Sequence, residues 1–251
     1  KVATKLDVHD IRFVPISAKL GDNVVDRSKK MDWYDGPTLM YLLETIHIAS
    51  DLNHLDTRFP VQYVIRPMKD EYHDYRGYAG RIESGVFHKG DKVKVLPSGL
   101  TSKIKSIDIF EGSIDEAFAP QSVTISLEDD IDISRGDLII KDNGLPRSGQ
   151  DIEMMLCWFH EKPMVLGGKY IVKHTTNDLR CVIRDVKYKI DINSLEHSEA
   201  NKHIGMNDIA KVVIKTTKPL FYDSYNQNRK MGSLILIDEA TNNTVAAGMI
   251  I

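Results

Sequence analysis

Residues 77–96 read GYAGRIESGVFHKGDKVKVL, and this stretch decides the fold class. We expect one strand from Gly77 to Ser84 and a second from Lys92 to Leu96, joined by the glycine-bounded segment 85–90. Glycines in such a strand let it bend or let another backbone approach closely. Short strands with glycine turns at this spacing are typical of a β-barrel or a β-sandwich.

More strands are expected on both sides of this stretch. Alternating or continuous apolar residues predict strands at 61–66, 101–110, 123–127 and 137–140. A segment dense in turn residues follows at 142–149. Beyond it, further strands are predicted at 152–159, 169–174, 179–190, 209–216, 233–237 and 245–251. The sequence therefore predicts two consecutive β-domains of about 100 residues each.

The first fifty residues have a different pattern. Ile11–Ile16 is predicted to be a short strand, and residues 17–21 a turn at its end. Pro37–Ile46 is predicted to be a helix with Pro37 in its first turn and one apolar face, formed by Leu39, Leu42, Leu43 and Ile46. We therefore expect a mainly β chain with a short α/β segment at 1–52 and two β-barrels at 53–144 and 145–251.

The composition excludes several classes of protein. With 42% hydrophobic and 27% charged residues, the chain can bury a sizeable core. A net charge of −3 disfavours nucleic-acid binding, which usually needs a strongly basic face. The sequence has no apolar run of ~18 residues and no signal peptide, so we expect a cytoplasmic protein without a membrane partner. Cys157 and Cys181 are too few for a disulfide framework and are expected to be small core residues.

A set of short motifs occurs in one particular order along the chain. They are FVPISA (13–18), GDNV (21–24), WYDGPTL (33–39), RFPVQYV (58–64), DYRGYAG (74–80), KVLPSG (94–99), DISRGD (132–137), YKIDIN (188–193), NR (228–229) and AGM (247–249). In this order they resemble the translational GTPases, in which a G domain precedes two β-barrels. The resemblance is to the GTP-binding subunit of heteromeric sulfate adenylyltransferase, which some bacteria fuse to an adenylylsulfate kinase.

One motif set of that family is absent from this sequence. There is no G-x-x-x-x-G-K-[ST] phosphate loop, and the D-x-x-G and N-K-x-D motifs are not in their expected places. The resemblance therefore implies a C-terminal fragment that begins near the end of the G domain. It implies GTP and Mg²⁺ as ligands of the intact protein, with no cofactor bound by the fragment and no activity in the fragment alone.

The resemblance also implies a guanine contact at Ser17, Ala18 and Lys19. In GTPases the backbone N–H at the alanine position donates to the guanine carbonyl, which discriminates because a wrong base leaves a donor unpaired. The Ser17 hydroxyl would brace the loop, and the Lys19 stem would cover the base. Without the resemblance, an ordinary turn between a strand and a loop explains the same residues.

Four residues are candidates for contacts between domains or with a partner. Arg76 and Arg81 flank a glycine motif that would move against the switch regions, although simple barrel closure also explains the glycines. Tyr225 and Arg229 lie in a polar, aromatic loop at 222–229, and both residue types are enriched at interface hot spots, with an ordinary well-packed loop as the alternative. The acidic segments 70–74 and 128–132 are expected to be solvated, with a cation site as the alternative.

By resemblance, the intact protein would couple GTP hydrolysis to the formation of adenylyl sulfate and pyrophosphate from ATP and sulfate. Its partner would be the small subunit, which carries the adenylyl-transfer site. One alternative is a translation elongation factor that binds aminoacyl-tRNA, for which a basic stripe across both barrels would be needed. Another is a stand-alone β-barrel interaction module without nucleotide chemistry.

Overall fold

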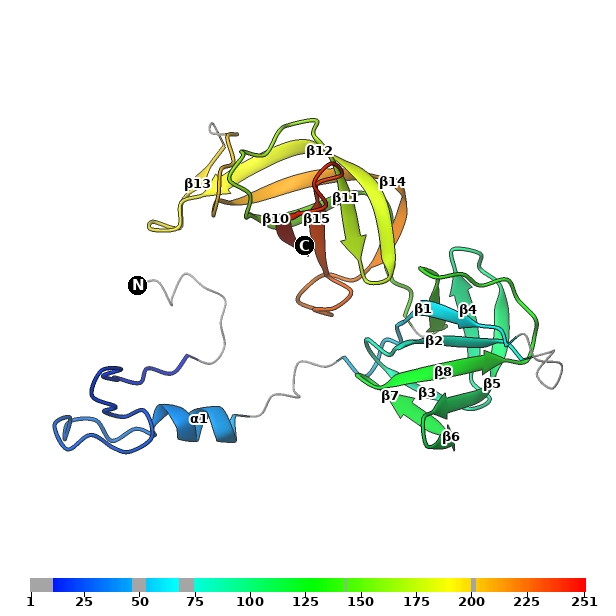
Figure 1. The fold of residues 1–251 in the computed structure, drawn as a ribbon, viewed down its shortest axis with the longest axis horizontal. Coiled ribbons are helices and arrows are strands. Elements are labelled where there is room, and N and C mark those ends of the chain that lie inside the picture. Colours follow the sequence, from blue (N-terminus) through cyan, green and yellow to red (C-terminus); the bar gives the residue numbers. More distant parts are fainter. Residues whose placement is uncertain (1–10, 47–52, 68–74, 143, 200–201) are drawn as a thin grey trace. The chain divides into compact units, whose positions relative to one another are not determined.

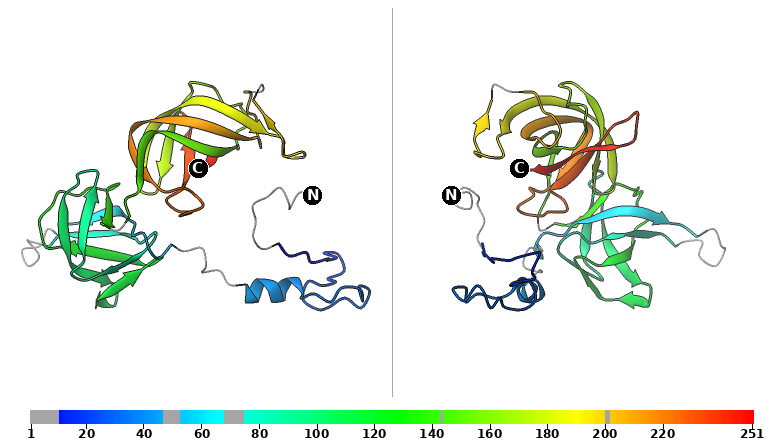
Figure 2. Two further views of the ribbon diagram at one scale, coloured as in Figure 1. Left: turned by 180° about the vertical axis from the view of Figure 1, so that it is seen from behind. Right: turned by 60° about the vertical axis from the view of Figure 1, so that its left-hand side comes forward.

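The computed structural model describes residues 11–46, 53–67, 75–142, 144–199 and 202–251 (Figure 1). The chain divides into two units, Lys1–Asp51 and Leu52–Ile251. The second unit contains both β-barrels, which Figure 2 shows from two further sides. The fold is mainly β, as the sequence predicts.

The first unit contains the helix α1 (Leu39–Thr45). Thr38 has an extended backbone, and its hydroxyl accepts a hydrogen bond from the Tyr41 amide, which makes Thr38 the N-cap. The helix therefore begins two residues later than predicted, and Pro37 precedes the cap instead of lying in the first turn. No residue of α1 is buried, and on the predicted apolar face Leu39 and Leu42 are half-buried while Leu43 and Ile46 are exposed.

The prediction of a strand at Ile11–Ile16 was wrong. Among the described residues of this unit, β-type pairing is limited to an isolated bridge between Ser17 and Asp22. A strand needs a neighbouring strand for its backbone N–H and C=O groups, and the described part of the unit supplies none. The apolar pattern of Ile11–Ile16 therefore leaves large side chains such as Phe13 exposed.

The described residues of the first barrel form nine strands. They are β1 (Phe59–Ile65), β2 (Gly77–Arg81), β3 (Val86–His88), β4 (Lys92–Leu96), β5 (Thr101–Ile109), β6 (Gly112–Ile114), β7 (Glu116–Phe118), β8 (Ser122–Leu127) and β9 (Leu138–Lys141). The strand order is β4-β9-β1-β2-β8-β5, and pairing of β4 with β5 closes the ring. β6 extends the sheet beside β5, while β3 and β7 pair with each other.

Alternating side chains fill the first barrel, with Phe59, Tyr78, Ile104 and Ile125 fully or almost fully buried. Gly80 shows why the decisive stretch is rich in glycine. It pairs with Val61 of β1, and a Cβ at Gly80 would lie 2.5 Å from the Pro60 carbonyl oxygen. The glycine therefore permits the close approach of two backbones, as predicted for this motif.

The second barrel follows without an intervening helix. Its strands are β10 (Arg147–Trp158), β11 (Lys169–His174), β12 (Asn177–Ile190), β13 (His197–Ser198), β14 (Ile209–Tyr222), β15 (Ser233–Ile237) and β16 (Thr244–Ile250). The order β11-β15-β16-β10-β14-β12 is closed by pairing of β11 with β12. The core includes Trp158, whose ring meets Tyr170 edge to face at 5.7 Å between centroids.

Most predicted strands are present, and β4, β11 and β15 have the predicted bounds. The strands that the sequence analysis missed, β3, β6, β7 and β13, are two or three residues long. β10 begins at Arg147, inside the segment predicted to be a turn, because residues 147–149 pair with 220–222 at the far end of β14. Partners that distant in sequence leave no local signal.

Candidate functional site

The proposed guanine loop forms a compact turn in the first unit. The Ser17 amide donates to the Asp22 carbonyl at 3.1 Å, and the Gly21 amide donates to the Ser17 carbonyl at 2.8 Å. The Ser17 hydroxyl accepts from the Leu20 amide at 3.3 Å, and its role in a guanine site stays a prediction. Ala18 and Lys19 are exposed in this turn, and Gly21 has the positive φ of 77° that closes it.

Asn23 holds this turn against the rest of the unit, and the sequence analysis did not identify it as a site residue. It is 2% exposed and has a positive φ of 58°. Its Nδ2 donates to the Pro15 carbonyl at 3.0 Å, and its Oδ1 accepts from the Ser28 amide at 2.8 Å. Its carbonyl accepts from the Leu39 amide at the start of α1, 3.0 Å away. The available signal was the GDNV motif, because Asn tolerates a left-handed backbone better than other non-glycine residues.

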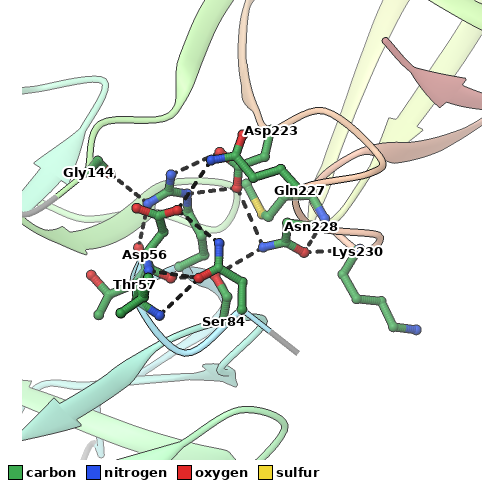
Figure 3. A network of polar contacts seen from close by, with 12 residues as sticks. Asp56, Thr57, Ser84, Gly144, Asp223, Gln227, Asn228 and Lys230 are labelled. Carbon is green, nitrogen blue, oxygen red and sulfur yellow. Dashed lines mark hydrogen bonds and ion pairs between the residues drawn. The ribbon is translucent and has the colours of Figure 1, made fainter. Parts of the chain in front are cut away.

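A buried ion pair joins the two barrels (Figure 3). Arg58 directly precedes β1, and Asp223 directly follows β14. Arg58 Nε donates to Asp223 Oδ2 at 3.0 Å, and Nη2 donates to Asp223 Oδ1 at 2.9 Å. Both residues are nearly inaccessible, with 1% and 2% of their surfaces exposed. Two parallel bonds of this kind fix the relative orientation of a guanidinium and a carboxylate.

Two backbone carbonyls accept hydrogen bonds from Nη1 of this arginine. Arg58 Nη1 donates to the Thr57 carbonyl at 2.9 Å and to the Gly144 carbonyl at 2.8 Å. Gly144 lies between β9 and β10, so the guanidinium also anchors the connection between the barrels. A buried charge that is paired and fully hydrogen-bonded is tolerated, whereas one without partners is not.

A second set of polar contacts runs beside the ion pair (Figure 3). Asn228 Nδ2 donates to the Ser84 hydroxyl at 3.0 Å, and Ser84 Oγ donates to the Asp56 carbonyl at 2.6 Å. Gln227 Nε2 donates to Asp56 Oδ2 at 3.3 Å. Asp223, Gln227 and Asn228 all come from the loop between β14 and β15, so this one loop supplies the second barrel's half of the network.

An apolar cluster completes the junction. Leu96, Leu138 and Ile140 of the first barrel pack with Met231 and Phe221 of the second. Because this cluster excludes water beside the ion pair, the two barrels share one continuous buried contact of apolar and polar groups.

Two further contacts extend the junction. His174 Nε2–H donates to the Met231 carbonyl at 2.8 Å, and burial holds the pKa of His174 below its usual value. Asn177 Nδ2 donates to the Gly136 carbonyl at 2.7 Å, and a Cβ at Gly136 would lie 2.5 Å from Asn177 Oδ1. Gly136 therefore lets the turn between β11 and β12 approach the first barrel.

The four residues predicted for interdomain or partner contacts lie in different places. Arg76 forms an ion pair with Asp130 and donates to the Ile131 carbonyl at 2.8 Å, and Arg81 Nε donates to the Pro120 carbonyl at 3.1 Å. These contacts lie within the first barrel. Their proposed contact with a partner stays a prediction.

Tyr225 and Arg229 lie in the junction loop, beside the residues that form the network. Tyr225 lines a cavity of about 580 Å³ together with Glu83 of the first barrel and Lys230. Burial raises the pKa of Glu83, and the nearby Arg81 and Lys230 oppose this shift. Arg229 is exposed. Any role of Tyr225 or Arg229 toward a partner stays a prediction.

The remaining candidate groups carry no reactive arrangement. Cys181 lies in the core of the second barrel, where burial raises its pKa to about 12, and Cys157 is partly exposed. In the segment 128–132, Asp129 accepts from the Ser102 hydroxyl at 2.8 Å, while the segment 70–74 lies outside the described residues. Among the described residues, no three His, Cys, Asp or Glu side chains are grouped to hold a metal ion. The described part of the chain also has no helix of the length and apolarity that a membrane span requires.

Known proteins resemble this chain over its whole length. Sulfate adenylyltransferase subunit 1 of Bacteroides fragilis is 49% identical over 251 residues, covering 100% of this chain and 52% of the relative. Over its whole length, the chain is therefore similar to sulfate adenylyltransferase subunit 1. The bifunctional enzyme CysN/CysC of Rhodopirellula baltica is 47% identical over 249 residues, covering 99% of this chain and 38% of that enzyme. The chain thus spans about half the length, or less, of these relatives.

The second barrel also matches a domain family, and solved structures share the fold. Residues 151–251 match the family described as "GTP-eEF1A C-terminal domain-like". The structure of Sup35 complexed with GDP has a TM-score of 0.71 at 20% identity, covering 97% of this chain and 59% of that chain. The apo form of translation elongation factor SelB from Methanococcus maripaludis has a TM-score of 0.65 at 17% identity, covering 85% of this chain and 45% of that chain. This chain thus shares its two-barrel fold with these proteins.

Proposed function

We propose that this chain forms the two-barrel part of a GTP-dependent sulfate adenylyltransferase subunit, with the end of its G domain at 1–52 and the barrels at 53–144 and 145–251. Its task is to transmit the state of a bound guanine nucleotide to the synthesis of adenylyl sulfate from ATP and sulfate. The observation that carries the coupling role is the buried Arg58–Asp223 pair, which connects the barrels at two hydrogen bonds of 2.9 and 3.0 Å.

The ion pair matters for coupling because of what it does to the geometry. A displacement of one barrel moves the other barrel only if the contact between the two resists bending. A bidentate, water-excluded ion pair flanked by an apolar cluster resists bending and sliding, because either motion would leave buried charges unpaired. The two barrels are therefore expected to move as one rigid body when the nucleotide state changes.

In this proposal, the first unit contacts the guanine nucleotide. Ser17, Ala18 and Lys19 form the exposed turn on which the guanine base would rest, and Asn23 holds the turn in place. GTP and Mg²⁺ would bind in the intact protein. The residues that contact the nucleotide phosphates would be ones that this sequence does not contain. The relative's name, subunit 1, supports the existence of a partner subunit, and we propose that this partner carries the adenylyl-transfer site.

The proposal is tested with the full-length protein assembled with its partner subunit. Adenylyl sulfate formation from ATP and sulfate is measured with GTP, with GMPPNP and without guanine nucleotide. The phosphosulfate anhydride makes the reaction unfavourable, so we expect GTP to raise the amount of product formed and GMPPNP to have no such effect. Product formation that is the same under all three conditions would refute the coupling role.

A matched pair of variants then separates coupling from catalysis. Asp223→Asn keeps the size of the side chain but removes the charge at the junction, and we expect it to reduce the effect of GTP on product formation. Asp178→Asn is the control, because Asp178 pairs at 3.9 Å with Lys173 on the surface of the second barrel. We expect Asp178→Asn to leave the effect of GTP unchanged.

A further inference from the structure

The outer wall of the second barrel contains a separate cavity of about 510 Å³. It lies over strands β11, β12 and β14, with contributions from the neighbouring β10 and from the loop after β15. The residues that matter here are Gln150, Lys169, Arg180, Val182, Lys215 and Thr217. None of them belongs to the junction or to the guanine loop.

The strand register places two lysines on either side of this cavity. Lys169 of β11 lies opposite Val182 of β12, and Val182 in turn lies opposite Lys215 of β14. Directly opposite residues have Cβ atoms ~5 Å apart, so the two lysines stand roughly 10 Å apart across the short Val182 side chain. Arg180 is two residues before Val182 and therefore projects from the same outer face.

The charges around the cavity are not balanced. Arg180 Nε forms an ion pair with Glu239 at 3.0 Å, and the neighbouring Arg184 forms one with Asp151 at 2.6 Å. Elsewhere on the same strands, Lys173 and Lys211 have carboxylate partners as well. Within the described residues, Lys169 and Lys215 have no carboxylate at ion-pair distance. Two lysines at this cavity therefore lack a carboxylate partner among the described residues, although the net charge of the chain is −3.

The polar rim of the cavity is held in place by a strand irregularity. The β10–β14 register shifts between Gly149 and Asp151, which brings Gln150 beside the chain at Thr216 and Thr217. Gln150 Nε2 donates to the Thr217 carbonyl at 3.2 Å, and Thr216 Oγ1 donates to the Lys218 carbonyl at 2.7 Å. These bonds fix one side of the cavity before any ligand arrives, which lowers the entropic cost of binding.

We propose that this cavity binds a small organic phosphate that carries at least two negative charges. Lys169 and Lys215 would bind the phosphate oxygens from the two sides, because an ammonium group at each end of a short gap neutralises a spread of negative charge. Arg180 and Gln150 would provide hydrogen bonds at the edge. A volume of about 510 Å³ falls in the range of small-molecule sites and exceeds what a single phosphate fills, so the ligand has a further group beyond the phosphate. This site does not depend on the proposed GTP-coupled function.

The test is a calorimetric titration of the chain with ADP and with inorganic pyrophosphate, using adenosine as the uncharged probe. We expect ADP and pyrophosphate to bind, binding to weaken as salt is added, and adenosine not to bind. The double variant Lys169→Gln/Lys215→Gln is expected to weaken both phosphate probes by about tenfold or more, because each lysine lost removes a charge-assisted hydrogen bond.

The control variant is Lys103→Gln/Lys105→Gln, which removes the same charge from exposed lysines of β5 in the first barrel. It is expected to bind like the unaltered chain. Equal binding by both double variants would overturn the proposal, since the charge of the chain as a whole would then explain the affinity. The absence of ADP and pyrophosphate binding would overturn it as well. Binding of a short RNA duplex without binding of ADP would assign the lysines to a nucleic-acid backbone and would also overturn it.

Discussion

Replacing Asp223 by alanine should destabilise the second unit far more than a surface substitution does. The variant removes both acceptors of Arg58 Nε and Nη2 while the guanidinium stays 1% exposed. Arg58 would keep its bonds to the Thr57 and Gly144 carbonyls, but its charge would have no counterion. Breaking one side of a buried ion pair costs about 3–5 kcal/mol, and we expect a loss of that size in the free energy of unfolding.

The structure also predicts how a second substitution changes this loss. In Arg58→Met/Asp223→Ala no buried charge remains, so the penalty of the unpaired guanidinium disappears. The Thr57 and Gly144 carbonyls then lack their donor, which costs about 1–3 kcal/mol. We therefore expect the double variant to be more stable than Asp223→Ala but less stable than the unaltered chain.

Urea unfolding followed by the fluorescence of Trp158 measures these differences. Trp158 is buried in the second barrel, and Trp33→Phe removes the signal from the first unit. Asp178→Ala is the control, because its pair with Lys173 is about half exposed and such pairs contribute less than about 1 kcal/mol. The reasoning is refuted if Asp223→Ala loses no more stability than Asp178→Ala.

Three further expectations concern single residues. Asn23→Ala should speed hydrogen exchange of the amides in 17–28, because the bonds to Pro15 and Ser28 are lost; unchanged exchange would contradict the role given to Asn23. A thiol reagent should modify Cys157 first and reach Cys181 only on unfolding, since Cys181 is buried with a pKa of about 12; equal rates would contradict this. Burial lowers the pKa of His174, so its contribution to stability is full above about pH 6.5 and falls as the pH drops toward the lower folded pKa. Between pH 7 and pH 5 the unaltered chain should therefore lose more stability in urea titrations than His174→Gln does; equal losses would show that His174 is not the group responsible.

The strands of the barrels could be predicted because the apolar pattern that indicates a strand lies within a few neighbouring residues. β4, β11 and β15 have the predicted bounds, since each is a short alternating or continuous apolar run ended by turn residues. The two- and three-residue strands β6 and β13 are too short to show a period. The start of β10 is fixed by residues 220–222 of β14, and no local pattern reports a partner at that distance.

The candidate site could be predicted only in part. The polar loop 222–229 was a candidate interface loop through Tyr225 and Arg229, whose contacts with a partner stay a prediction. Asp223 and Asn228 of this loop, which form the junction, were not singled out. Arg58 could not be identified from the sequence as a junction residue, because arginine is rarely fully buried and its partner lies 165 residues away. The strand predicted at Ile11–Ile16 failed for the opposite reason, since an apolar pattern predicts a strand but does not supply the neighbour that a strand needs.

The central claim is that the two barrels move as one body when the nucleotide changes. The most direct test is the distance between spin labels at Glu111 and Thr241, exposed positions on the first and second barrel, in the full-length protein with Cys157 replaced by serine. We expect one narrow distance distribution that is the same with GDP and with GMPPNP. A distance that shifts between the two nucleotide states would show that the junction bends and that the barrels do not move as one body.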